Sequence, residues 1–328
     1  MAVLYVTEQG SVLRKESKRL VIEKEGKVLL EVPEFKVDRV LIFGNIQVTT
    51  QAISFLLERG IETSFFTISG RLKGKLSPLE SKNVFLRVFQ YKRYLDEEFK
   101  LNLSKIVIEG KIKNEVVFLQ RYQRNHQEID FSLPLKKLGE CLNALSKKTK
   151  VSTVIGVEGF ASSIYFEALG KMFRKELSFE TRSRRPPGDP VNALLSLGYT
   201  LITNEILSLI SGIGFDPYIG YLHGINYGRP SLALDLVEEF RHPIIDRLTL
   251  SLINKEVLNS EDFEEKDGGF YLEDKPRKDY FLYYEKYLQR KFSYEGEELN
   301  FRRLFQIQTQ KMAKTIQEKV PYHYFLMK

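Results

Sequence analysis

Ser69-Gly-Arg-Leu-Lys-Gly-Lys-Leu-Ser-Pro78 is the stretch at which the sequence changes character, and it decides the fold. Its two glycines and its proline are typical of a linker. Before it, short β-branched or alternating runs predict strands. After it, apolar residues recur at three- and four-residue intervals, which predicts helices. The sequence therefore predicts an α+β protein with a β-rich domain at 1–75, a linker at 76–83 and a larger all-α domain at 84–328.

The predicted strands of the first domain are separated by glycine-bearing or charged turns. They lie at Ala2–Val6, Ser11–Arg14, Arg19–Glu23, Val28–Val32, Val40–Phe43 and Glu62–Thr67, with one helix at Thr50–Arg59. Strands that follow one another at roughly 8–12-residue spacing predict a small antiparallel sandwich or barrel. We expect the sandwich.

The second domain shows helical spacing almost throughout. Helices are predicted at Val84–Phe99, Ser104–Arg124, Pro134–Ser146, Phe160–Phe173, Val191–Ile213, Leu232–Phe240, Pro243–Ile253, Tyr280–Lys291 and Leu299–Lys319. A hairpin with Pro276 at its tip is expected at Gly268–Asp279, between two of these helices.

Composition excludes several classes of protein. A single cysteine, Cys141, excludes a disulfide framework and a cysteine-rich zinc site, so a reducing cytoplasm is expected. The amino-terminal residues show no signal-peptide pattern. The longest apolar run, Leu201–Ile213, contains Thr203, Asn204 and Glu205, so no membrane-spanning segment is expected.

The charge distribution indicates a polyanionic partner. Net charge is +7, and residues 81–150 carry 15 Lys and Arg against 8 Asp and Glu, whereas residues 151–240 carry 7 against 10. A basic stretch followed by an acidic one is typical of phosphate binding beside a cation-binding centre. Solvated helix faces of different charge are the alternative.

Of the four histidines, His223 is the candidate for chemistry. It lies in Gly220-Tyr-Leu-His-Gly224, where flanking glycines allow a close approach of backbone and ligand. His126, His242 and His323 are expected at the surface, at a helix boundary and in packing, respectively.

Acidic residues on either side of His223 complete a possible metal site. Asp235 and Glu238 stand three apart on a predicted helix and so share one face, although two exposed acids are the simpler alternative. Glu158 lies between glycines, where it is expected to open a helix or merely to cap it. Carboxylates with one imidazole suit Mg²⁺ or Mn²⁺ better than zinc, and such an ion activates an attacking hydroxyl at a phosphodiester.

Basic and aromatic residues near these acids are candidate DNA contacts. They are Arg182, Arg184 and Arg185 in a proline-fixed turn, Arg229 and Arg241 beside the His and acid segments, and Tyr165, one helical heptad after Glu158. Surface solubility is the alternative role for the arginine-rich turn.

Four ordered motifs resemble the integrase–nuclease family of CRISPR adaptation, the Cas1 family. They are Ile155-Gly-Val-Glu-Gly159, Arg184-Arg-Pro-Pro-Gly-Asp-Pro-Val-Asn192, Gly220-Tyr-Leu-His223 and Ser231-Leu-Ala-Leu-Asp-Leu-Val-Glu-Glu-Phe-Arg241, supported by Leu41–Asn45 and Gly70–Gly74. The resemblance implies metal ligands at Glu158, His223 and Glu238, with Asp235 as a further acid of the site.

The same resemblance implies a function in antiviral defence. The activity would be a divalent-metal-dependent cleavage of DNA and the joining of 3′-hydroxyls of short DNA fragments (protospacers) to the CRISPR repeat by transesterification. It also implies a β-sandwich dimerisation domain, a helical catalytic domain, a homodimer, and a small ferredoxin-like partner, Cas2, in a heterohexameric complex.

Two other functions stay open on the residues alone. A plain metal-dependent nuclease would use the same ligands without integration. A nucleic-acid-binding scaffold would carry these acids on solvated helix faces and would lose little when they are substituted.

Overall fold

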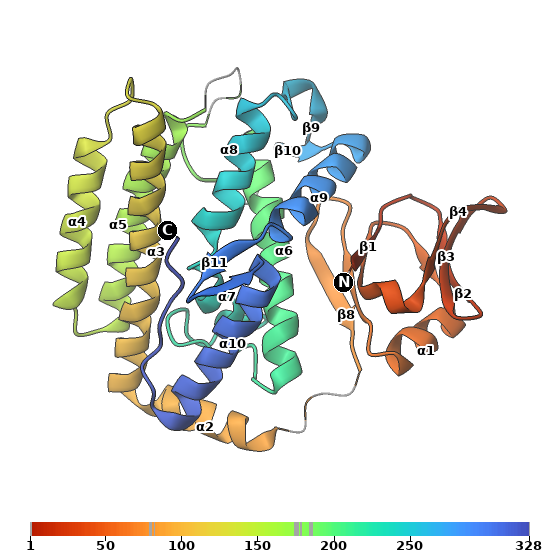
Figure 1. Cartoon of the computed structure of the whole chain (residues 1–328), viewed down its shortest axis with the longest axis horizontal. Helices are drawn as coiled ribbons and strands as arrows, with labels where there is room; N and C mark the ends of the chain where they lie inside the picture. The colour runs from red at the N-terminus through yellow and green to blue at the C-terminus, as the bar shows by residue number, and fades with distance from the viewer. Residues whose placement is uncertain are drawn as a thin grey trace. The chain divides into compact units, whose positions relative to one another are not determined.

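The computed structural model describes residues 2–78, 81, 83–173, 177, 179–183 and 186–327. The chain divides into two compact units, shown in Figure 1. Unit 1 consists of residues 1–80 with residues 277–281, and unit 2 consists of residues 81–276 and 282–328.

Unit 1 contains two four-stranded sheets. The first has the order β1-β5-β7-β8, with strands Ala2–Val6, Val37–Phe43, Glu62–Phe66 and Leu72–Leu76; the second has the order β4-β3-β2-β6, with strands Lys27–Pro33, Arg19–Lys24, Val12–Glu16 and Gln47–Val48. One buried cluster draws Val6 and Val40 from the first sheet, Leu13 and Leu20 from the second, and Leu56 from helix α1 (Thr50–Glu58). Burial of these apolar residues holds the unit together.

Two expectations for unit 1 are wrong. The strands are not all antiparallel, because β5 runs parallel to both β1 and β7, and β2 runs parallel to β6. Helix α1 lies between β5 and β7 in the chain and supplies the crossover that a parallel pair needs. The predicted linker Ser69–Pro78 contains strand β8, antiparallel to β7. Gly74 pairs with Phe65 beside a register shift between the two strands, a place where glycine is common.

Unit 2 is mostly helical. Its helices are α2 (Val84–Leu95), α3 (Glu97–Asn125), α4 (Ser132–Ser146), α5 (Val151–Gly170), α6 (Pro190–Ile213), α7 (Ser231–Val237), α8 (Arg247–Asn254), α9 (Asp274–Leu288, of which residues 277–281 group with unit 1) and α10 (Phe301–Glu318). Side chains of Asp96, Asp189 and Asn300 cap the amino termini of α3, α6 and α10. A π-helical segment, Arg241–Asp246, leads into α8.

The second domain is not all-α, which corrects the sequence-based expectation. Hairpins are formed by β9 (Phe263–Lys266) with β10 (Gly269–Leu272), and by β11 (Phe292–Tyr294) with β12 (Glu297–Leu299). The hairpin expected at Gly268–Asp279 therefore lies earlier, with its turn at Asp267 and Gly268, both at positive φ. Pro276 belongs to the first turn of α9, where a missing N–H costs nothing. Short 3₁₀ turns occur at Glu34–Lys36 and Ser260–Asp262.

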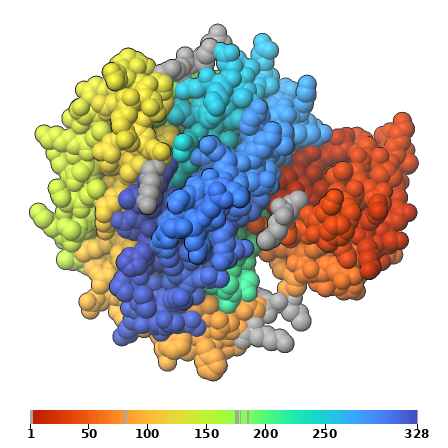
Figure 2. All heavy atoms as spheres, viewed as in Figure 1, coloured from red at the N-terminus to blue at the C-terminus, as the bar shows by residue number. Residues whose placement is uncertain are grey.

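Helix α6 and the segment after α10 both pack against other elements of unit 2. By length and composition α6 is apolar enough to cross a membrane, but 67% of its apolar window is buried in the fold, so packing accounts for its composition. The residues after α10 return along α3 (Figures 1 and 2), where Asn114 donates to the Phe325 carbonyl at 2.8 Å. Gly110 permits this approach, because a Cβ there would lie 2.5 Å from the Tyr324 ring.

Candidate active site

The loop that carries His223 is held by the Asp235 carboxylate. Asp235 Oδ2 accepts the backbone N–H groups of Tyr221 and Leu222 at 2.6 and 3.1 Å. Its Oδ1 accepts the backbone N–H of His223 at 3.1 Å and lies 2.7 Å from ring Nδ1. Because an ionised carboxylate only accepts hydrogen bonds, Nδ1 carries a proton, and in the neutral ring Nε2 keeps its lone pair.

Two further contacts hold the same loop against α7. A Cβ on Gly220 would lie 2.6 Å from the Ser231 carbonyl carbon, so only glycine fits at this position. Arg229 donates to the His223 carbonyl, and its Nε donates to Ser231 Oγ at 3.3 Å. The loop is therefore positioned before any ligand binds, and His223 Nε2 lies 3.8 Å from Glu238 Oε1.

One buried ammonium bridges two of the predicted ligands. Lys111 Nζ, from the middle of α3, donates to Glu158 Oε1 and lies 2.9 Å from Glu238 Oε2. Glu238 directly follows α7, and its Oε1 lies 3.1 Å from Arg241 Nε. Glu158 and Glu238 thus share one ammonium, and His223 lies beside Glu238, although the three residues are far apart in the sequence.

Both carboxylates are ionised at neutral pH despite their burial. Burial disfavours the charged form of Glu238, but Arg241, Lys111 and His223 hold its pKa well below the usual range. Burial has the same effect on Glu158, and Lys111 again outweighs it and lowers the pKa. Burial also opposes the charge of Lys111, yet the Glu238, Glu158 and Glu115 carboxylates raise its pKa. Two negative charges therefore converge on one cation position.

Glu158 lies in the interior of α5, not at its start. The helix begins at Val151, so the expected amino-terminal cap and dipole argument for Glu158 is wrong. The glycines on either side of Glu158 are accommodated within the helix because its packing, rather than propensity, decides the conformation. Ser162, one turn on, donates to Glu158 Oε1 at 3.0 Å and fixes the carboxylate.

The Asp235 carboxylate faces the His223 loop. Both of its oxygens are occupied by the His223 loop, and its side chain is 2% exposed. Asp235 orients the imidazole through its contact with Nδ1. Its four hydrogen bonds to the loop leave it no free lone pair for a cation at the Lys111 position. We therefore treat Asp235 as the positioning partner of His223 and not as a direct ligand.

The predicted DNA contacts are mostly used inside the protein. Tyr165 is fully buried and donates to Asp246 Oδ2 at 2.9 Å, so the predicted nucleotide contact is wrong. Arg182 donates to Asn192 Oδ1 at 2.7 Å and to Ser196 Oγ at 3.0 Å, which ties the turn to α6. Arg184 and Arg185 lie outside the described residues.

Arg241 is the predicted DNA contact that belongs to the centre itself. Its guanidinium pairs with Glu238 and lies over the Tyr199 ring, 4.6 Å from the centroid. With Lys111 it supplies positive charge beside the two carboxylates. Arg229, by contrast, acts through the His223 loop.

Lys111 is not among the residues predicted from the sequence, although the sequence contains a signal for its buried ion pairs. Lys111 and Glu115 stand four apart on the apolar stripe of α3, where Val107 and Leu119 are buried. Charged residues on a buried stripe need partners, and this position predicts a polar network inside the fold. His242 is part of the same network: it is fully buried, with Nδ1 2.6 Å from Asp246 Oδ2 and Nε2 3.1 Å from Glu115 Oε1.

Within the described ranges, no three His, Cys, Asp or Glu side chains form a ready-made metal cage. The Lys111 ammonium lies between two of the predicted ligands instead. The donor set nevertheless fits a hard cation, because two ionised carboxylates already share one positive charge and an oriented imidazole lies next to them.

Comparison with known proteins gives consistent matches over nearly the whole chain. Residues 4–286 match the family model described as CRISPR associated protein Cas1. A CRISPR-associated endonuclease Cas1 of Thermus thermophilus is 38% identical over 270 residues, which cover 82% of this chain and 79% of that protein. Two solved structures superpose closely. A casposase bound to its integration product has a TM-score of 0.87 at 26% identity, covering 98% and 92% of the two chains. A Cas1 protein from Thermotoga maritima has a TM-score of 0.84 at 28% identity, covering 96% and 97%.

Proposed function

Because this chain belongs to the Cas1 family and is an endonuclease and integrase of CRISPR spacer acquisition, we propose that Glu158, His223 and Glu238 form its active centre. The observation that carries the proposal is the Lys111 ammonium shared by Glu158 and Glu238, with His223 Nε2 3.8 Å from Glu238. A cation site with an adjacent imidazole suits phosphodiester chemistry.

The proposed cofactor is Mg²⁺ or Mn²⁺, held by Glu158, Glu238 and His223 in place of the Lys111 ammonium. When bound, the ion polarises the phosphodiester and lowers the pKa of the attacking hydroxyl. The oxygen-rich donor set with a single nitrogen favours these ions over zinc.

The chain's own residues supply the remaining steps. His223, whose tautomer Asp235 fixes, would present the lone pair of Nε2 to the ion, and the proton of the incoming hydroxyl would pass to solvent. Arg241 and Lys111 place positive charge where the phosphate oxygens gain negative charge. With a 3′-hydroxyl as nucleophile the outcome is strand joining, and with water it is cleavage. The likeness to a casposase solved with an integration product supports joining.

The test is a Mn²⁺-dependent joining assay with a 3′-hydroxyl DNA fragment and a supercoiled target that carries a CRISPR repeat. Glu158→Gln should lower the rates of joining and cleavage about 100-fold or more. Glu167→Gln, on the same helix but 76% exposed, is the matched control and should keep the wild-type rates. Joining by Glu158→Gln at the wild-type rate would remove the assigned centre.

We also propose an assembly and a location. The strand-rich unit would be the sandwich that joins two copies in a homodimer, and two dimers would be bridged by Cas2 in a heterohexamer on protospacer and repeat DNA. Family membership supports this assembly and its location in the cytoplasm. Light scattering of the chain with and without Cas2 tests the stoichiometry, and a monomer under both conditions would contradict it.

A further inference from the structure

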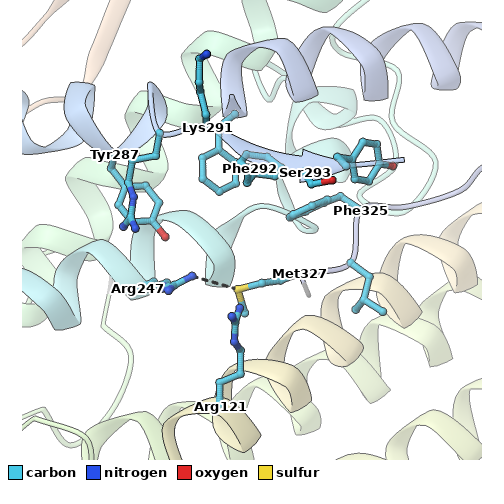
Figure 3. Close-up of a pocket in the computed structure, with 12 residues that line it drawn as sticks. Arg121, Arg247, Tyr287, Lys291, Phe292, Ser293, Phe325 and Met327 are labelled. Atoms are coloured by element: carbon cyan, nitrogen blue, oxygen red, sulfur yellow. Dashed lines mark hydrogen bonds between the residues drawn. The ribbon is translucent and has the colours of Figure 1, made fainter. Parts of the chain in front are cut away.

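A cavity of about 190 Å³ lies in unit 2, apart from the acid centre, and is shown in Figure 3. Its walls come from α3, α8, the end of α9, β11 and the carboxy-terminal segment. None of Glu158, His223 and Glu238 lines it. Arg121, on its floor, is ten residues beyond Lys111 on α3, which corresponds to about 15 Å along the helix.

Among the residues that the structure describes, cations line the cavity and no acidic side chain does. Arg121, Arg247, Arg290 and Lys291 contribute to its walls. Lys291 pairs with Glu298 at 2.7 Å, but within the described part of the chain Arg121, Arg247 and Arg290 have no carboxylate partner at ion-pairing distance. Burial lowers the pKa of Arg121, and the neighbouring charges of Arg247 and Arg124 lower it further. Such mutual repulsion is relieved when an anion binds.

Flat aromatic side chains form the opposite part of the wall. Figure 3 shows Phe292 and Phe325 across from the guanidinium groups of Arg121 and Arg247. The two rings lie 6.1 Å apart between centroids, and Phe292 is only half-buried, so part of its surface faces the cavity. Arg247 reaches toward the cavity and contacts Met327 Sδ at 3.9 Å, a weak acceptor that leaves its charge unneutralised.

A ligand that fits these walls combines an anion with a flat apolar ring. A free phosphate would leave the aromatic wall unused, and an apolar ligand would leave the arginines without an anion. Arginine forks bind phosphate oxygens, and aromatic side chains stack on bases of unpaired strands regardless of sequence. We propose that this cavity binds one unpaired nucleotide of a DNA strand, with its phosphate at Arg121 and Arg247 and its base against Phe292.

The cavity would thus anchor a DNA strand at a place separate from the proposed acid centre. It does not depend on the metal centre, because binding needs neither Glu158 nor a divalent ion. Binding measured in EDTA therefore tests the cavity alone.

The experiment uses the absence of tryptophan from the chain. A Phe292→Trp variant of the full chain carries a single indole at the cavity, so its fluorescence reports binding there. A thymidine tetranucleotide in EDTA should quench it in a saturable way. Adding Arg121→Gln and Arg247→Gln should weaken the affinity about tenfold or more. Adding Lys136→Gln and Lys137→Gln, exposed residues of α4 with the same charge change, should leave it unaltered.

A comparison of three probes identifies which chemical groups of a ligand the cavity binds. An abasic tetranucleotide should bind several-fold more weakly than the thymidine one, and tetraglutamate should not compete. Equal affinity for the abasic probe, competition by tetraglutamate, or the absence of saturable quenching would overturn the proposal. The anisotropy of a fluorescein-labelled tetranucleotide measures the affinity with Phe292 intact. It compares the variant with Arg121→Gln and Arg247→Gln against the variant with Lys136→Gln and Lys137→Gln. Equal affinities of these two variants would also overturn it.

Discussion

Lys111 balances the charge of the acid centre. Its side chain is 6% exposed, and it contacts carboxylates from α5 and from the end of α7. A buried ammonium costs free energy unless it is paired, and here two carboxylates pair with it. A divalent ion held by Glu158 and Glu238, as proposed above, would therefore compete with this ammonium for the two carboxylates.

Lys111→Met should therefore bind Mn²⁺ more tightly and fold less stably without it. We expect the Kd for Mn²⁺, measured by calorimetry, to fall about tenfold, because no ammonium has to be displaced. The metal-free variant should lose about 3 kcal/mol of unfolding free energy, because Glu158 and Glu238 lose a buried counter-charge. Lys113→Met, two residues on and 41% exposed, is the control for both measurements. Weaker Mn²⁺ binding by Lys111→Met would contradict the competition.

Asp235→Asn tests the role of this residue behind His223. The substitution keeps the size of the side chain but removes a charge that accepts four hydrogen bonds from the loop. We expect joining to slow about 10- to 100-fold and the pH–rate profile to change, because the preferred tautomer of His223 is lost. The melting temperature identifies any purely structural loss. An unaltered rate and profile would show that Asp235 does not act through His223.

At the scale of the element, the His223 loop owes its position to α7. Gly220 passes so close to Ser231 that a methyl group would meet the backbone of that residue. Glycine is needed here because of this contact, not because of positive φ.

Gly220→Ala should therefore destabilise unit 2 by about 1–3 kcal/mol and displace His223. The comparison is Gly212→Ala in α6, where a Cβ meets nothing within 4 Å. That substitution should be neutral or slightly stabilising, since alanine favours a helix. Thermal melting and the joining assay measure both effects. Equal stability of the two variants would show that the loop can move away from α7.

For the whole of unit 2, a buried network around His242 links the helices. His242 lies between Glu115 of α3 and Asp246 of the π-helical segment, and Asp246 also accepts from Tyr165 of α5 and Tyr199 of α6. Burial alone would lower the pKa of His242, but the two carboxylates raise it to about 9. The imidazolium thus stabilises the folded state.

This network predicts a dependence of stability on alkaline pH. Because the folded pKa exceeds the unfolded one of 6.5, the contribution is fully present below pH 6.5 and is lost as the pH rises through 9. Denaturant unfolding of unit 2 should show a decline of about 3 kcal/mol between pH 6 and pH 9.5. His242→Gln should be less stable at pH 6 and lack that decline, whereas His126→Gln should keep it. A wild-type stability that is constant over this range would contradict a charged His242.

The sequence by itself determined the change from strands to helices near residue 80 and singled out Glu158, His223 and Glu238, which the structure brings close to Lys111 or to one another. Hydrophobic periodicity and short motifs encode these features locally. Only the tertiary structure decided the parallel pairing of β1, β5 and β7, the mid-helix place of Glu158 and the burial of Tyr165. It also placed Lys111 between two carboxylates and turned Asp235 toward the His223 loop. The partner of a buried charge is set by which elements converge on it, and no local pattern records that convergence.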